Sequence, residues 1–273
     1  MKLSLLELIE IEKSKGYSDD NASAKVCQDL ILEAIANSPF NRNVTIKGGV
    51  VMRAKTHNVR RATQDLDIDF IKHSLTSSSI DEFIDKLNTI EGVIFVRNGD
   101  IEDLNQQDYH GKRAYILVKD NTGFQIISKI DFGVNKKNKI EQEEYCFDIS
   151  YAEGSISLLI NSSEQIFTEK LRSLLKFGPF STRYKDIFDM YYLINHIEID
   201  KILICLNSYI YQDSEMRESD INDIYNRVKF TFNNRTFQRR IKTTDKKWID
   251  ENIEDILNEI LAFFRSLQMI KDI

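Results

Sequence analysis

Three aspartates alternate with apolar residues in the run Asp65-Leu66-Asp67-Ile68-Asp69-Phe70. Successive side chains of a β-strand point to opposite faces, so the three carboxylates share one face of the strand that this pattern predicts. Carboxylates within about 7 Å of one another repel strongly unless a cation lies among them. Oxygen ligands of this kind suit Mg²⁺, which proteins hold with one or two carboxylates plus substrate phosphates. The run therefore predicts a divalent-metal site that works on phosphates.

A glycine pair lies upstream, where a β-type run at residues 44–46 leads through Lys47 into Gly48 and Gly49. Glycine lets the backbone approach a ligand closely, and the N–H groups at the start of the next helix can face an anion. A phosphate cradle followed by metal-binding carboxylates is what nucleotidyl transfer requires. Metal ions in such sites bridge the triphosphate, activate the attacking hydroxyl and stabilise the leaving pyrophosphate.

The two motifs, Lys-Gly-Gly and then Arg-x-Thr-x-Asp-Leu-Asp-x-Asp, resemble the DNA polymerase β-type nucleotidyltransferase superfamily. Within it they are most similar to the AbiEii/AbiGii toxin family of abortive-infection and toxin–antitoxin systems. Gly49 stands where many relatives have Ser, and the spacer at residues 50–64 is longer than in minimal enzymes. Both departures are common in the toxin branch, so they favour that family over antibiotic-modifying relatives.

The resemblance assigns roles to residues of both motifs. Asp65 and Asp67 are expected to hold Mg²⁺ or Mn²⁺, and Asp69 takes part if the metal pair is Asp67 and Asp69. The residues expected to bind the NTP substrate are Lys47, Gly48, Gly49, Arg53 and Thr63.

A third carboxylate is expected on a later strand. In the run at residues 126–133, apolar Ile130 and Phe132 flank Asp131, which puts Asp131 on the opposite face. Similarity to the family's Lys-Ile-Asp strand supports the same residue. Asp131 would then serve as a general base or as a metal ligand that lowers the pKa of the incoming hydroxyl.

A second motif region begins near residue 163, where the chain becomes strongly helical. Glu-Lys-Leu, a break at Gly178-Pro179, and then Arg-x-Lys-Asp-x-x-Asp resemble the other hallmark of the toxin family. The match assigns the family's lysine to Lys170 and its acidic pair to Asp186 and Asp189. Both acids share a helix face with Arg183. Lys170 and Arg183 are expected near the triphosphate, and spacing alone does not decide which acid matters more.

Composition describes an ordinary globular chain of 273 residues, with 42% hydrophobic and 29% charged residues. Acids interrupt the apolar N-terminal run, so it does not read as a signal peptide, and no stretch of about 18 uncharged apolar residues predicts a membrane span. A cytoplasmic location is expected. The three cysteines and four histidines show no metal-ligand spacing.

The net charge of −6 gives no overall attraction to nucleic acid, but cations cluster locally. One cluster is Lys136, Lys137 and Lys139. Another surrounds Phe237 and Trp248, and it consists of Arg235, Arg239, Arg240, Lys242, Lys246 and Lys247. Such a run is commonly a solvated face, yet the interleaved aromatics also fit contact with RNA.

These patterns predict an α+β fold in two domains. Residues 1–162 are expected to form a nucleotidyltransferase domain with a mixed or antiparallel sheet and helices, and residues 163–273 a helical bundle. The resemblance implies a metal-dependent enzyme that moves an NMP from an NTP onto RNA, at the 3′ end of tRNA, with an antitoxin encoded alongside. A protein or small-molecule acceptor, or nucleotide binding without turnover, remain alternatives.

Overall fold

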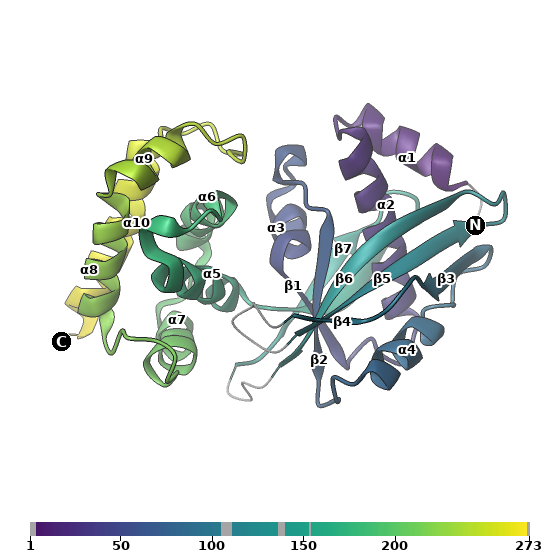
Figure 1. The fold of residues 1–273 in the computed structure, drawn as a ribbon, viewed down its shortest axis with the longest axis horizontal. Coiled ribbons are helices and arrows are strands. Elements are labelled where there is room, and N and C mark those ends of the chain that lie inside the picture. The colour runs from purple at the N-terminus through teal and green to yellow at the C-terminus, as the bar shows by residue number, and fades with distance from the viewer. Residues whose placement is uncertain (1–3, 105–110, 136–139, 153, 272–273) are drawn as a thin grey trace. The chain divides into compact units, whose positions relative to one another are not determined.

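The fold was analysed in a computed structural model that describes residues 4–104, 111–135, 140–152 and 154–271. The chain divides into two compact units, residues 1–161 and residues 162–273. The first combines a sheet with helices and the second is helical (Figure 1). The predicted α+β class, with a mixed sheet followed by a helical region, is confirmed.

In the described residues of the first unit, eight strands form one sheet, in the order β3-β5-β6-β2-β1-β8-β7, with β4 paired to β5. The strands are β1 (Val44–Lys47), β2 (Asp65–Ile71), β3 (Val93–Arg97), β4 (Glu102–Leu104), β5 (Gly111–Asp120), β6 (Gln125–Asn135), β7 (Glu143–Asp148) and β8 (Ser155–Ile160). The β2–β6 and β1–β8 pairs are parallel and the other pairs are antiparallel.

Four α-helices accompany these strands in the described part of the first unit: α1 (Leu5–Ser14), α2 (Asp19–Ala36), α3 (Gly48–Thr56) and α4 (Ser77–Lys86), with a 3₁₀ turn at Val59–Arg61. One face of the sheet is apolar, because the alternation along β2 and β6 directs Phe70 and Phe132 to the same side. Phe83 of α4 packs on both rings, at 5.7 Å and 5.5 Å between centroids. The carboxylates of β2 and β6 therefore lie on the opposite face.

Strand β8 extends the sheet beyond β1. It pairs in parallel with β1 through Ile46 and Ile160, and the Asn161 N–H donates to the carbonyl of Ile46. These contacts fix the strand that leads into the glycine turn.

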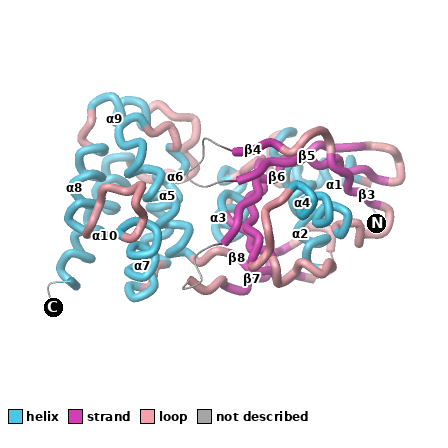
Figure 2. The backbone as a smooth tube through the Cα atoms, turned by 60° about the horizontal axis from the view of Figure 1, so that its bottom comes forward, coloured by secondary structure: helices cyan, strands magenta, loops and turns pink. Residues whose placement is uncertain are grey.

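The second unit contains α5 (Ser163–Phe177), α6 (Tyr184–Leu193), α7 (Ile199–Leu206), α8 (Ile221–Phe232), α9 (Arg235–Lys242) and α10 (Ile253–Lys271). Short 3₁₀ helices at Gly178–Phe180 and Ile194–His196 and a π-helical turn at Asn207–Tyr211 join them. Figure 2 shows the helices packed side by side, with α9 at one end of this unit and α7 at the other.

Two helices of this unit follow irregular segments. The last helix begins at Ile253, after an irregular stretch that contains Trp248. The residue that precedes α6 is Arg183, and no side chain in the described part of the chain caps the helix. None of the helices in the described residues combines the length and the hydrophobicity that a bilayer span requires.

Candidate active site

The acidic strand β2 lies between β1 and β6, and both neighbours present polar side chains to its carboxylates. Antiparallel pairing sets Lys47 opposite Asp67 and Thr45 opposite Asp69. The Lys47 Nζ lies 2.7 Å from Asp69 Oδ1, and both side chains are buried. Because Asp69 is buried in its ion pair, whereas Asp65 is half exposed, the arrangement favours Asp65 and Asp67 over Asp67 and Asp69 as the metal pair.

Strand β6 brings the third carboxylate alongside. Parallel pairing sets Asp131 beside Asp67 and Lys129 beside Asp65, all on one face of the sheet. Arg113 of β5 holds Asp131 with two parallel hydrogen bonds, from Nε to Oδ1 at 2.7 Å and from Nη2 to Oδ2 at 2.9 Å. These bonds to the carboxylate raise the pKa of Arg113 above its ordinary value. Asp131 is thus rigidly oriented by a charge-assisted fork.

Asp65 and Asp67 have different surroundings. Asp65 is half exposed, and its Oδ1 lies 2.7 Å from the Nζ of Lys129. Asp67 sits directly against Gly48: a Cβ at position 48 would be closer to Asp67 Oδ2 than real Cβ atoms come to any neighbour. Gly48 also has a φ of +65°, a left-handed conformation that side chains other than glycine rarely adopt. The glycine turn and the Asp67 carboxylate therefore share one small space.

We next tested whether these residues fit a divalent cation. Their hard oxygen donors, their common face and their register suit Mg²⁺ or Mn²⁺. In the described residues, however, no three Asp, Glu, His or Cys side chains are grouped closely enough to hold a metal ion. Asp65 and Asp131 are instead paired with Lys129 and Arg113. The chemistry of the three carboxylates fits a divalent cation, which would compete with these ion pairs.

The side chain of Thr63 explains why position 49 is a glycine. A Cβ added at position 49 would lie 2.5 Å from the Oγ1 of Thr63 and 2.7 Å from its Cβ. The threonine side chain thus fills the space in which a serine at position 49 would stand. Thr63 brings its own hydroxyl to the first turn of α3, which accounts for the departure from the Gly-Ser form of the motif.

We expect Gly49→Ala to destabilise the protein by about 1–3 kcal/mol, because it overpacks this contact. Removal of the opposing side chain in Gly49→Ala/Thr63→Gly should recover part of the loss, with a coupling free energy of about 1 kcal/mol or more. Chemical denaturation of the wild type, both single variants and the double variant measures this coupling. Strictly additive losses would contradict the contact.

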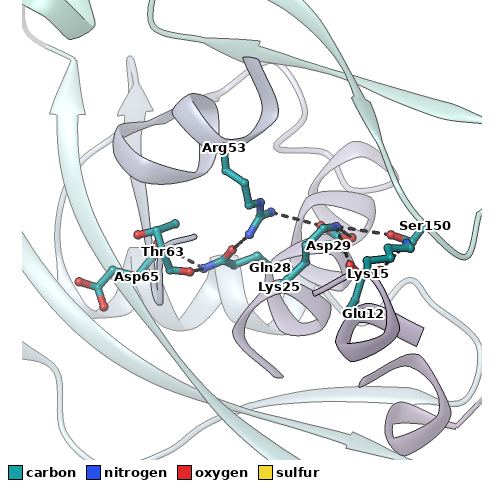
Figure 3. A network of polar contacts seen from close by, with 9 residues as sticks. All are labelled: Glu12, Lys15, Lys25, Gln28, Asp29, Arg53, Thr63, Asp65 and Ser150. Carbon is teal, nitrogen blue, oxygen red and sulfur yellow. Dashed lines mark hydrogen bonds and ion pairs between the residues drawn. The ribbon is translucent and has the colours of Figure 1, made fainter. Parts of the chain in front are cut away.

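Arg53 does not extend from α3 toward the carboxylates. Figure 3 shows it inside the fold, where it donates to the side-chain oxygen of Gln28 and lies 3.4 Å from Asp29 Oδ1. The Nε2 of Gln28 donates in turn to the carbonyls of Thr63, at 3.0 Å, and of Asp65, at 3.4 Å. This geometry supports a positioning role for Arg53 in place of the predicted contact with the substrate. It ties α2 to α3 and to the start of β2.

The same network continues to the far side of α2. Asp29 is fully buried and pairs with Lys25 at 2.5 Å, and Lys25 reaches Glu12 of α1 (Figure 3). Burial raises the pKa of Asp29, against the opposing attraction of Lys25 and Arg53. Three helices therefore hold the segment that carries Thr63 and Asp65.

We expect Gln28→Ala to destabilise the protein by about 1–3 kcal/mol, because Arg53 and the carbonyl of Thr63 lose their buried partner. Thermal unfolding measures the loss. Gln212→Ala, at an exposed position, is the matched control and should leave the unfolding temperature unchanged. Equal unfolding temperatures for the two variants would show that the network does not contribute to the stability of this unit.

The second motif region forms a separate charged cluster inside the helical unit. The Nζ of Lys170 in α5 lies 2.8 Å from Asp186 Oδ1 and 2.8 Å from Asp189 Oδ2, both in α6. Arg183 Nε lies 2.8 Å from Asp186 Oδ2, and the Trp248 indole N–H donates to Asp189 Oδ1 at 3.1 Å. The structure thus brings all four predicted residues of this region together.

The two acids of that cluster have different surroundings. The Asp189 side chain is 0% exposed and holds both Lys170 and Trp248, so its environment is that of a core residue. Asp186 joins buried Lys170 to Arg183, whose side chain is 64% exposed. Of the pair, Asp186 is therefore the one connected to a solvent-accessible cation.

Several residues of these clusters are missing from the sequence reading: Arg113, Lys129, Gln28 and Trp248 in its role beside Asp189. Lys129 and Arg113 were open to prediction, since both fall on the face of Asp131 by strand alternation and pairing of the two strands. Gln28 lies in an apolar helical stripe and gives no signal. Lys136, Lys137 and Lys139 lie outside the described residues.

Comparison with known proteins places the chain in a family. The profile described as nucleotidyl transferase AbiEii toxin, type IV toxin–antitoxin system, matches residues 30–267. No curated protein sequence matches the chain.

Among solved structures, the chain is similar to an antigenic nucleotidyltransferase-like protein from Paracoccidioides brasiliensis, with a TM-score of 0.43 and 14% identity over 81% of this chain and 93% of that one. It is also similar to the antibiotic-resistance factor ANT(2'')-Ia, with a TM-score of 0.40 and 16% identity over 68% of this chain and 92% of that one. The family match covers most of the sequence, and the resemblance drawn from the two motifs is confirmed. The chain belongs to the AbiEii family of nucleotidyltransferase toxins and is itself a nucleotidyltransferase.

Proposed function

We propose that the protein transfers an NMP from an NTP to a hydroxyl of RNA, at the 3′ end of tRNA, and acts in the cytoplasm as the toxin of a toxin–antitoxin or abortive-infection system. A cognate antitoxin encoded alongside is part of this proposal. The observation that carries it is the register of Asp67 and Asp131 on neighbouring strands, beside the left-handed turn at Gly48. A carboxylate pair next to exposed backbone N–H groups suits a triphosphate and an attacking hydroxyl.

Each residue of the sheet site has a distinct proposed task. Gly48 and Gly49 begin α3, whose first N–H groups are not capped by a side chain of the described residues and would face the phosphate oxygens, and the Thr63 hydroxyl lies beside that turn. Asp131, oriented by Arg113, accepts the proton of the acceptor hydroxyl. Lys47 balances the charge of Asp69 through a buried ion pair and so fixes the strand that carries Asp67.

Asp65, Asp67 and Asp131 are the residues that would hold Mg²⁺ or Mn²⁺, which when bound lowers the pKa of the attacking hydroxyl and neutralises charge on the triphosphate. Lys170 and Arg183 are the proposed contacts of the helical unit with the NTP. Asp186 orients both of these cations, and Asp189 holds Lys170 from the buried side.

The test is to incubate the protein with Mg²⁺, total tRNA and each α-labelled NTP in turn, beside the Asp65→Ala/Asp67→Ala variant. We expect label in tRNA with the wild type alone, and the productive NTP identifies the nucleotide. Label in protein or in a small molecule would replace the RNA acceptor with one of those. Bound NTP without any transfer would contradict the proposal and leave a nucleotide-binding protein.

A further inference from the structure

The region around α9 is strongly basic within an acidic chain. Residues 227–247 contain eight Lys or Arg residues and one acid, whereas the whole chain has a net charge of −6. Lys242 and Lys246 form exposed ion pairs with Glu254 and Asp245. In the part of the chain that the structure describes, the guanidinium groups of Arg235, Arg239 and Arg240 are exposed and have no acidic or hydrogen-bonding partner.

Helix stability accounts for only part of this charge. Arg239 and Arg240, in the last turn of α9, gain from the helix dipole. Arg235 is the first residue of α9, where the helix dipole disfavours a cation, and it lies four residues before Arg239, where like charges repel. Phe237 and Ile241 bury the opposite side of the helix. The exposed side therefore carries more positive charge than the helix itself requires.

An exposed aromatic ring belongs to a neighbouring segment. Phe180 is 82% exposed, and it ends the 3₁₀ helix Gly178–Phe180, which contacts α9. The turn is held by a hydrogen bond from the Ser181 N–H to the carbonyl of Gly178, and Tyr184 packs on Phe237 at 5.9 Å between ring centroids. The turn thus holds a large exposed ring on a segment that contacts the helix of the three arginines.

The sequence pattern pointed to Phe237 and Trp248 as the aromatics of an RNA-contacting cluster. The structure corrects that choice, because both rings are buried in the helical unit and are unavailable for stacking. Phe180, which is distant in the sequence, replaces them. No local sequence pattern indicates that the segment of residue 180 contacts α9.

We infer that Arg235, Arg239, Arg240 and Phe180 form a binding surface, here called the α9 surface, for single-stranded RNA. Arginine pairs with phosphates through its planar fork, and an aromatic ring stacks on a base of any sequence. A paired helix would hide its bases from Phe180, which favours an unpaired strand. The inference rests on the proposed function, for which this surface would hold the acceptor strand.

The experiment measures binding of a fluorescein-labelled single-stranded RNA, and of the same sequence as a duplex, to the full chain by anisotropy. EDTA is present and NTP is omitted, so the sheet site contributes neither metal nor nucleotide. The first variant is Arg235→Gln/Arg239→Gln/Arg240→Gln. Its matched control, Lys86→Gln/Lys119→Gln/Arg217→Gln, removes the same charge from other exposed positions.

We expect the arginine variant to bind the single strand at least about tenfold more weakly and to lower the slope of log K against log salt by about two, since each lost phosphate contact removes roughly 0.7. Phe180→Ala should weaken binding about fivefold or more without a change of slope, because it removes stacking alone. The control should match the wild type, and the duplex should not respond to Phe180→Ala.

An arginine variant that binds as the control does would overturn the inference, as would a wild type that does not bind RNA. Polyglutamate that displaces the RNA at an equal concentration of negative charge would instead identify an acidic protein as the occupant. That result would also overturn the inference. Pyrophosphate release, measured on the same proteins, separates this outcome from the proposed reaction. Pyrophosphate release without specific RNA binding would contradict only the inference about the α9 surface. RNA binding without pyrophosphate release would contradict only the proposed reaction.

Discussion

Replacement of Asp67 by Asn is expected to lower nucleotide transfer about a thousandfold, with the fold intact. Asp67 lies beside both Asp131 and the Gly48 turn, so it is the carboxylate shared by the proposed metal and phosphate positions. Loss of a metal ligand removes several kcal/mol of transition-state stabilisation, and each 1.36 kcal/mol is about a factor of ten in rate. Transfer of label from the productive α-labelled NTP measures the effect.

The matched control is Asp103→Asn, which changes another strand carboxylate that is paired with a lysine. It should retain full activity and the same circular dichroism spectrum as Asp67→Asn. Binding of Mn²⁺ provides a readout apart from turnover. It is measured by electron paramagnetic resonance, as the decrease of the signal of unbound Mn²⁺. A folded Asp67→Asn protein that transfers the nucleotide at the wild-type rate would contradict the assignment of this site.

Replacement of Asp189 by Ala is expected to destabilise the helical unit by about 3–5 kcal/mol. The substitution leaves the buried Lys170 ammonium with one carboxylate in place of two, and it removes the acceptor of the Trp248 indole N–H. Removal of one partner from a buried ion pair leaves a charge that is poorly compensated. Since Trp248 is the single tryptophan of the chain, its fluorescence during urea denaturation reports this unit directly.

The comparison for this prediction is Asp186→Ala, whose side chain is more accessible and whose removal leaves the Lys170–Asp189 pair in place. We expect a smaller loss of stability for Asp186→Ala than for Asp189→Ala. We also expect a larger loss of NTP affinity for Asp186→Ala than for the surface change Asp200→Ala. If Asp186→Ala shifts the Trp248 transition as far as Asp189→Ala does, the two acids are not distinguished by burial.

The sequence was sufficient to predict the placement of residues wherever a motif falls on a single helix or strand. Alternation along residues 65–70 places the three aspartates on one face, and that arrangement follows from strand geometry alone. The break at Gly178 ends α5, where the residue adopts a φ of +51°. The family resemblance, carried by two local motifs, extended this reading to the fold class.

The sequence was insufficient where a long-range partner decides the environment of a residue. Arg53 is spaced like a phosphate ligand, but Gln28 and Asp29 of α2 draw it into the fold. Asp69 alternates with Asp67 as regularly as Asp65 does, yet Lys47 neutralises it. Spacing along one strand cannot distinguish these cases, because the deciding side chains come from other elements.

The contact between Gly49 and Thr63 has a consequence for how this protein can diverge from its relatives. Only one of the two positions has room for a side chain, so serine at 49 and threonine at 63 exclude each other. A change from one form to the other by single substitutions must pass through an intermediate that lacks both side chains or crowds them together. The glycine and the threonine therefore constrain each other, and a substitution at one of the two positions is tolerated only together with a change at the other.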